Sequence, residues 1–189
     1  MVTLIGISGS LRQGSFNSAL LRTAAQLLPD GAVLHIATIR GIPLYDADVE
    51  VSDGIPTVVA ALKDKIAAAD GLLLATPEYN NSMPGVTKNA VDWLSRPPSD
   101  IRRVFGGKPV ALVGASPGVY GTILSHNAWL PVLRALGAQL WSEGRLLIPR
   151  AQSVFAEDGA LTDSKVRDAL RSFLEGYLKF VESARRGQS

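Results

Sequence analysis

The sequence contains no cysteine and only two histidines among its 189 residues. The first absence excludes a disulfide framework, a thiolate metal site and a cysteine nucleophile. His35 alternates with apolar residues in a predicted strand, and a single histidine in that setting favours a structural role over metal binding. The second histidine, His126, lies far away in the sequence, in a predicted helix. We therefore predict no metal site.

Charge of one sign and long apolar runs are also scarce. The formal net charge of +2 is too small to indicate a nucleic-acid partner. No apolar run reaches the roughly 20 residues that a transmembrane helix needs, and the chain starts in a predicted strand instead of a basic leader segment. We expect a cytoplasmic protein with no membrane span. A hydrophobic content of 47% suits one globular domain, predicted over residues 1–184, with a disordered tail at 185–189.

The first thirty residues contain the clearest chemical signal. Residues 2–8 are an apolar, β-branched run typical of a strand covered on both faces, and apolar residues recur at helical spacing over 19–28. The connecting loop is rich in glycine and carries Ser10, Arg12, Ser15 and Asn17. Such a loop directs backbone N–H groups at an anion from the positive end of a helix dipole. We predict a phosphate-binding loop, with an ordinary Gly/Ser turn as the alternative.

Two common phosphate-binding motifs do not match this loop. Gly9 and Gly14 have the separation of a Walker A loop, but Ser15 stands where that motif needs lysine. A dinucleotide-binding fingerprint needs a different glycine spacing and an acidic residue after the second strand, where this chain has Ala37 and Thr38. What remains is a loop for one terminal phosphomonoester, held by hydroxyls, amides and a single arginine.

The rest of the chain alternates strands and helices. We predict strands at 32–38, 71–76, 109–115 and 139–149, the last interrupted at 142–144, and helices at 57–69, 86–95, 124–136 and 162–184. Residues 42–56 carry several acidic side chains without the glycine and bidentate glutamate of a calcium-binding EF-hand, so we predict a solvated loop. The pattern predicts the α/β class: a flavodoxin-like three-layer sandwich with a five-stranded parallel sheet in the order 2-1-3-4-5.

Ligands of such sheets bind beyond the carboxyl ends of the strands. Residues 76–85 and 116–121 should therefore open beside the phosphate loop, with Ser82 as the expected cap of the following helix. One loop for phosphate and two loops rich in backbone amides, each with an aromatic residue, suit a flat heteroaromatic ring with a phosphorylated side chain.

Two segments carry a family resemblance: GSLRQGSFN at 9–17 and TPEYNNSMPGVTKNAVDWLSR at 76–96. Together they resemble the NADPH-dependent FMN reductase family, and within it the chromate and quinone reductase branch. The resemblance implies non-covalent FMN, with NADPH or NADH as co-substrate and quinones, free flavin or chromate as acceptors in a ping-pong cycle. It implies no catalytic residue in the usual sense, because the hydride chemistry belongs to the cofactor.

The site residues implied by the resemblance fall into three groups. The phosphate group is Ser10, Arg12, Ser15, Phe16 and Asn17; the isoalloxazine group is Pro77, Glu78, Tyr79 and Asn80; and the closing loop supplies Ser116 and Gly118. Glu78 has no evident partner in the sequence, so we expect its backbone and not its carboxylate to contribute. Pro117 lacks a backbone N–H donor. The contacts of the closing loop are therefore the least secure of those that the family resemblance implies.

Two other classes of function compete with this reading. A flavodoxin-like electron carrier without turnover is disfavoured by the lack of an acidic docking surface. A hydrolase is suggested by Gly6 and Ser8, but a nucleophile elbow also needs glycine where Ser10 stands. Similar proteins are homodimers or homotetramers, and Tyr45, Trp93 and Trp129 are candidate subunit contacts, although the two tryptophans also suit core positions.

Overall fold

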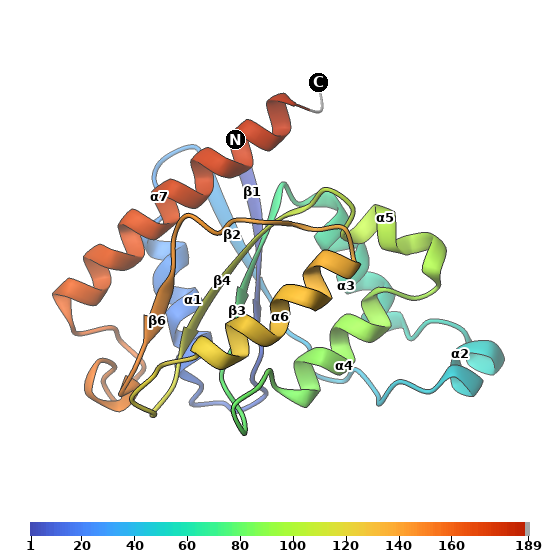
Figure 1. Ribbon diagram of the computed structural model, residues 1–189, viewed down its shortest axis with the longest axis horizontal. Helices are drawn as coiled ribbons and strands as arrows, with labels where there is room; N and C mark the ends of the chain where they lie inside the picture. Colours follow the sequence, from blue (N-terminus) through green and yellow to red (C-terminus); the bar gives the residue numbers. More distant parts are fainter. Residues whose placement is uncertain (188–189) are drawn as a thin grey trace.

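The computed structural model describes residues 1–187 as a twisted parallel sheet between two layers of helices (Figure 1). The strands are β1 (Val2–Ser8), β2 (Ala32–Ala37), β3 (Gly71–Ala75), β4 (Pro109–Ala115), β5 (Gln139–Leu140) and β6 (Leu146–Ile148). Their order is β2-β1-β3-β4-β5, with β6 also paired to β4, and every pairing is parallel. β5 and β6 are two parts of one interrupted edge strand, so the predicted order 2-1-3-4-5 is confirmed.

The helices divide between the two faces of the sheet. α1 (Phe16–Leu27) and α7 (Ser164–Arg186) cover one face, and α3 (Thr57–Ala68), α4 (Gly85–Leu94), α5 (Ile101–Val104) and α6 (Ile123–Ala135) cover the other (Figure 1). Short 3-10 helices, η1 (Pro98–Asp100) and η2 (Ala151–Ser153), join longer elements. No helix in the described part of the chain is both long enough and apolar enough to span a bilayer.

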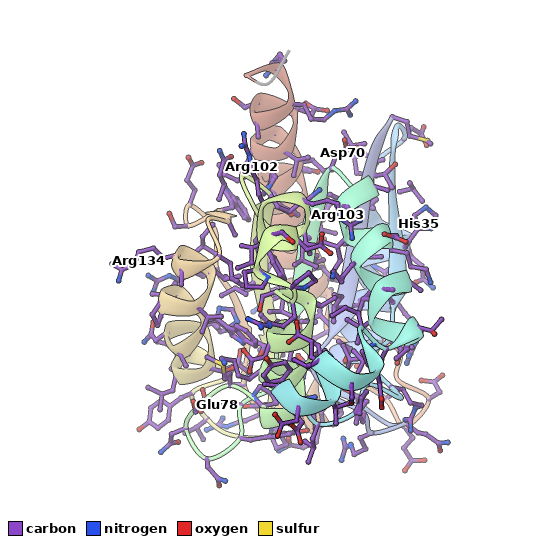
Figure 2. The ribbon with its side chains drawn as sticks, turned by 90° about the vertical axis from the view of Figure 1, so that its right-hand side faces the viewer. His35, Asp70, Glu78, Arg102, Arg103 and Arg134 are labelled. Carbon is purple, nitrogen blue, oxygen red and sulfur yellow. The ribbon has the colours of Figure 1, made fainter. Side chains whose placement is uncertain are left out.

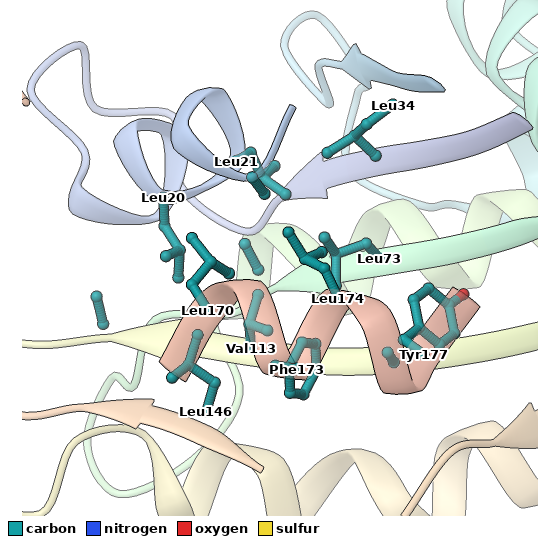
Figure 3. Close-up of a cluster of buried hydrophobic side chains, with 14 of the residues drawn as sticks. Leu20, Leu21, Leu34, Leu73, Val113, Leu146, Leu170, Phe173, Leu174 and Tyr177 are labelled. Atoms are coloured by element: carbon teal, nitrogen blue, oxygen red, sulfur yellow. The ribbon is translucent and has the colours of Figure 1, made fainter. Parts of the chain in front are cut away.

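The central strands are apolar along their whole length because both of their faces are covered. On the α1/α7 side, Leu20 of α1 and Leu174 of α7 meet Leu73 of β3 and Val113 of β4 in one buried cluster (Figure 3). The hydroxyl of Tyr177, also in this cluster, bonds to the carbonyl oxygens of Leu72 and Pro109 at 3.0 and 2.9 Å. Since the burial is almost complete, it raises the pKa of Tyr177 well above its ordinary value. This core fixes the carboxyl ends of β1, β3 and β4 side by side.

The prediction of a solvated loop at 42–56 is wrong. Residues Ala47–Asp53 form helix α2, capped by the Asp46 side chain, which accepts a hydrogen bond from the Asp48 backbone. None of the α2 residues is buried, so the helix lacks the apolar periodicity from which it could have been predicted. It projects from the body of the molecule (Figure 1). An ion pair at 2.8 Å between Glu50 and Arg96 joins it to the end of α4.

Three smaller expectations also need correction. Ser82 does not cap α4, because Pro84 occupies the N-cap position. The chain does not become irregular at Arg185: α7 continues to Arg186, and Arg185 reaches the Met1 carbonyl oxygen at 3.1 Å. Residues 188–189 of the predicted tail lie outside the described residues. Trp93 and Trp129 are both fully buried within the chain, so they are core residues and not subunit contacts.

Candidate functional site

Three loops leave the carboxyl ends of β1, β3 and β4 at one end of the sheet (Figure 1). We name them the cradle loop (residues 9–15), the platform loop (76–84) and the closing loop (116–121). Hydrogen bonds join each of these loops, or the residues directly beside it, to the other two. The three loops are therefore held next to one another at this end of the sheet.

The cradle loop touches the platform loop at Gly9. The Gly9 N–H donates to the Ala75 carbonyl oxygen at 2.8 Å, and the Thr87 hydroxyl donates to the Gly9 carbonyl oxygen at 2.9 Å. A Cβ atom at position 9 would lie 2.8 Å from Thr87 Oγ1 and 2.9 Å from Pro77 Cδ. Glycine is required here by the close approach of the two loops. Further along, the hydroxyls of Ser10 and Tyr79 are 3.5 Å apart.

The cradle loop offers hydrogen-bond donors suited to an anion. The Ser15 hydroxyl accepts from the Ser18 N–H at 3.3 Å as the N-cap of α1, which leaves its own hydrogen free to donate. Within residues 1–187, the backbone N–H groups of Ser15, Phe16 and Asn17 have no hydrogen-bond partner. Unpaired N–H groups and the dipole of α1 together favour a phosphate at this point.

Arg12 adds positive charge to the same loop. Its guanidinium donates to the Gly14 carbonyl oxygen at 2.8 Å and lies 5.6 Å from the centroid of the Phe16 ring. This places the charge beside the unpaired N–H groups while leaving other guanidinium donors uncommitted. The arrangement suits a doubly charged terminal phosphate.

Asn17 has a different role from the predicted one. Its side-chain amide donates to the Ala115 carbonyl oxygen at 2.9 Å and accepts from the Ala115 N–H at 3.0 Å, and the residue is 3% exposed. Both ends of the amide are thus engaged by the end of β4. The side chain holds α1 against the sheet, and only its backbone N–H is available to an anion.

The platform loop is a tight hairpin. Tyr79 and Ser82 exchange two backbone hydrogen bonds, each 3.0 Å long, and the intervening Asn80 and Asn81 have φ values of 49° and 60°. Two consecutive positive φ values are typical of a type I′ turn, for which asparagine is favoured. The hairpin holds the Tyr79 ring partly exposed beside the cradle loop.

The Glu78 carboxylate has partners that the sequence did not reveal. Its Oε2 atom accepts from the backbone N–H groups of Leu124 and Ser125 at 2.8 and 3.1 Å. These groups belong to the first turn of α6, whose N-cap residue Thr122 makes no side-chain cap. Glu78 therefore caps a distant helix and ties the platform loop to the element that follows the closing loop. Figure 2 shows Glu78 at the opposite end of the molecule from Asp70.

The closing loop is folded on itself. The Ser116 hydroxyl donates to the Gly121 carbonyl oxygen at 2.6 Å, and the Ser116 N–H donates to the Ile148 carbonyl oxygen at 3.0 Å. Both donors of Ser116 are consequently engaged within the protein. The backbone N–H groups of Gly118, Val119 and Tyr120 have no partner in the described part of the chain. These amides, and not Ser116, are the donors that the loop presents.

The three loops fit FMN on the evidence of their donors. The cradle loop concentrates N–H groups, hydroxyls and a guanidinium, as a phosphate requires. The other two loops carry backbone amides that are unpaired within residues 1–187, beside exposed aromatic rings. No group of His, Cys, Asp or Glu able to hold a metal ion is found among the described residues. A parallel sheet in this order, with an anion-binding loop after its first strand, defines a flavodoxin-like nucleotide-binding protein.

Comparison with known proteins identifies the family within this flavodoxin-like class. A family model described as NADPH-dependent FMN reductase matches residues 2–153. An NAD(P)H-dependent FMN reductase of Pseudomonas aeruginosa is 43% identical over 184 residues, covering 97% of each chain. A 2-hydroxy-1,4-benzoquinone reductase of a Burkholderia species is 40% identical, covering 95% of this chain and 96% of the relative. The structure of the NAD(P)H:acceptor oxidoreductase FerB from Paracoccus denitrificans superposes with a TM-score of 0.86 at 33% identity, covering 97% and 99% of the two chains.

The chain belongs to the NADPH-dependent FMN reductase family. It is accordingly a flavodoxin-like oxidoreductase that uses FMN with NAD(P)H as co-substrate, as the two sequence motifs predicted. Membership of an enzyme family also decides against an electron carrier without turnover. Sequence reasoning missed Thr87, Ala115 and the Glu78 cap, because each acts through a contact with a residue far away in the chain.

Proposed function

We propose that this protein transfers electrons from NAD(P)H through bound FMN to quinones. The observation that carries the proposal is the mutual attachment of the three loops, which aligns an anion-binding loop with two amide-bearing loops. FMN, when bound, accepts a hydride from NAD(P)H and passes electrons to a second substrate. Relatives named quinone reductase, including one from Escherichia coli at 37% identity, support the choice of acceptor.

The residues have separate tasks in this proposal. Ser10, Arg12 and Ser15 hold the FMN phosphate together with the backbone amides of Phe16 and Asn17. The platform loop, from Pro77 to Asn80, lies against the isoalloxazine ring, and the closing-loop amides near Gly118 face its pyrimidine edge. Amides directed at that edge stabilise negative charge on the reduced ring. Ser116 supports the closing loop internally.

Two exposed aromatic rings on the loops also favour a ping-pong cycle with broad acceptor choice. Tyr79 of the platform loop and Tyr120 of the closing loop are 47% and 78% exposed. Flat substrates can stack on such a surface, and NAD(P)H and the acceptor would occupy it in turn. Free flavin and chromate are further proposed acceptors. We also propose a homodimer or homotetramer, with Tyr45 at a contact between subunits. Light scattering, which measures the mass of the assembly in solution, tests this.

The decisive experiment compares the wild-type protein with Arg12→Ala. Purified wild type should be yellow, bind FMN at micromolar concentration or tighter, and oxidise NADPH with benzoquinone. Loss of a charge-assisted contact worth roughly 1.5–3 kcal/mol should weaken FMN binding by about 10- to 100-fold in the variant. Arg134→Ala, an exposed arginine at the far end of α6 (Figure 2), serves as the charge-matched control. A colourless wild type that refuses added FMN would overturn the proposal.

A further inference from the structure

The middle of the cradle loop has few contacts that hold it in place. Residues 11–14 are all exposed, so no core packing fixes them, and the two hydrogen bonds that Arg12 donates stay within the loop. Within residues 1–187, one hydrogen bond joins this exposed stretch to another segment: the Arg40 guanidinium donates to the Leu11 carbonyl oxygen at 2.5 Å. The arrangement of the loop therefore depends on a residue that lies outside both sequence motifs.

The sheet brings Arg40 to the cradle loop. β1 and β2 pair in parallel, so their carboxyl ends lie side by side, and the cradle loop leaves one while the segment that contains Arg40 leaves the other. Because the two segments are 29 positions apart in the chain, their contact has no signature in the local sequence. It follows from the strand order.

Arg40 is presented from a well-fixed turn. The Ile42 N–H donates to the Ile39 carbonyl oxygen at 3.4 Å, and Gly41 has a φ of +83°. A glycine with positive φ at the third position is typical of a type II turn, which puts Arg40 at the second position. The Ile39 side chain is buried, and the Arg40 N–H donates to the Thr38 hydroxyl at 3.1 Å. The turn that carries the arginine is thus anchored to the core.

The Arg40 side chain does not serve to neutralise a carboxylate. Within residues 1–187, the Leu11 carbonyl oxygen is the only hydrogen-bond partner of its guanidinium, which forms no ion pair. A surface arginine that balances charge would have an acidic partner. The contact with the cradle loop is therefore what the fold provides for this side chain.

This hydrogen bond fixes the orientation of the peptide group between Leu11 and Arg12. In a trans peptide the C=O and N–H bonds point in opposite directions. The carbonyl oxygen points to Arg40, and the N–H on the other side of the same peptide donates to the Ser10 hydroxyl at 3.3 Å. Rotation of the peptide would break both hydrogen bonds and would redirect the Arg12 side chain. Arg40 therefore fixes the direction in which Arg12 leaves the loop.

We propose that Arg40 is a positioning residue for FMN. Acting through the Leu11 carbonyl oxygen, it holds the Ser10 hydroxyl and the Arg12 guanidinium in the orientation that receives the phosphate, and it does not contact the phosphate itself. The inference rests on the proposed function and adds to it a residue from the segment after β2. A loop that is ordered before the ligand arrives loses less conformational entropy on binding, so the affinity for FMN rises.

The test compares Arg40→Ala with a control, Arg102→Ala, which removes an exposed arginine from α5 at the opposite end of the molecule from Glu78 (Figure 2). Titration of the full-length protein with FMN should give a Kd about three- to tenfold higher for Arg40→Ala and an unchanged Kd for the control. Turnover of NADPH with benzoquinone at saturating FMN should stay within about twofold of wild type, because the variant changes how tightly FMN is held and not how it reacts.

A double variant tests whether Arg40 acts through Arg12. Two residues that work through one contact network have non-additive effects. We therefore expect Arg40→Ala to raise the Kd for FMN by less than about twofold when Arg12 is already alanine. A rise as large as in the wild-type background would mean that Arg40 acts on FMN independently, and the positioning role would be overturned.

Two further results would overturn the inference. One is an unchanged Kd for FMN in Arg40→Ala. The other is a loss of turnover at saturating FMN together with a lower melting temperature of the flavin-free protein, which would show general damage to the fold. Both are separable from failure of the proposed function. If wild type binds FMN and oxidises NADPH while Arg40→Ala behaves identically, only the role of Arg40 fails. If wild type neither binds FMN nor turns over, the proposed function itself fails.

Discussion

At the scale of single residues, the site depends on side chains that bind protein and not ligand. Asn17 illustrates this, because its amide matches the N–H and the carbonyl oxygen of Ala115, a residue 98 positions further along the chain. The sequence predicted Asn17 as a site residue from its place in a loop rich in donors, and the structure places it in the first turn of α1, directly after that loop. Its partner could not be predicted, since nothing in the local sequence shows which strand end lies opposite.

Asn17→Asp tests this structural role. The carboxylate would lose the donor to the Ala115 carbonyl oxygen and bring a buried negative charge against it, so we expect the free energy of unfolding to fall by about 2–4 kcal/mol. Urea denaturation at neutral pH measures the change. Asn127→Asp, at an exposed position on α6, should alter the stability by less than about 0.5 kcal/mol. Equal effects of the two substitutions would contradict the role given to the Asn17 bridge.

Glu78 gives a second prediction at this scale. Because its carboxylate caps α6 from the platform loop, Glu78→Ala should leave two N–H groups without an acceptor and lower the stability by about 1–2 kcal/mol. FMN binding should weaken as well, since the platform loop loses its attachment. Glu78→Gln keeps a carbonyl oxygen for the same groups and should recover most of both losses. Thermal unfolding and FMN titration of the two variants check this, and a Gln variant as weak as the Ala variant would argue against capping.

At the scale of helices and strands, the apolar pattern was sufficient wherever an element is buried. β3 and β4 are buried at every position, and they appear in the sequence as uninterrupted apolar runs. Helix α2 was missed for the opposite reason, because it buries no residue. Its Glu50 side chain pairs with Arg96 and accepts a hydrogen bond from the Tyr45 hydroxyl. Apolar periodicity reports burial, so an exposed helix held by polar contacts leaves no periodic signal.

The platform hairpin provides the prediction for this scale. Asn81 has a φ of 60°, which glycine adopts without strain and a β-branched residue does not. We expect Asn81→Val to distort the turn, lower the melting temperature by several degrees and weaken FMN binding, whereas Asn81→Gly should stay close to wild type. Melting curves with and without FMN measure both effects. A valine variant with unchanged FMN affinity would show that the turn geometry does not support the cofactor.

At the scale of the whole molecule, the three loops belong to the cooperative structure of the fold. Their carboxyl-edge location followed from the predicted sheet order, which alternation of strands and helices was enough to give. Their mutual attachment did not follow, because the joining contacts link residues separated by 46 to 98 positions. Local sequence therefore predicted which loops gather at this end of the sheet, and the tertiary contacts decide which of their groups are free to bind a ligand.

The free energy of unfolding at acidic pH is a property of the whole molecule. We expect one side chain on α6, His126, to control it. The His126 Nε2 atom is buried without a hydrogen-bond partner. Burial lowers the pKa of His126 from 6.5 to about 4, with Arg145 acting in the same direction and a hydrogen bond to the Val113 backbone opposing it. The unfolded chain therefore binds more protons than the folded protein between pH 6.5 and about 4. Stability should fall as the pH falls through this window.

A shift of this size corresponds to roughly 3 kcal/mol lost by pH 4, at about 1.4 kcal/mol for each pH unit of pKa difference. Urea denaturation between pH 7 and 4.5 should give a steep decline for wild type and a flatter one for His126→Gln, which cannot gain a charge. His35→Gln, at an exposed position on β2, should keep the wild-type slope. Hydrogen bonding to cationic neighbours lowers the pKa of Glu50 and Asp100 from 4.5 and 3.8, so the stability that these carboxylates contribute is lost mainly below pH 4.5, the end of the measured range. Parallel declines in wild type and His126→Gln would show that His126 does not control the acid stability.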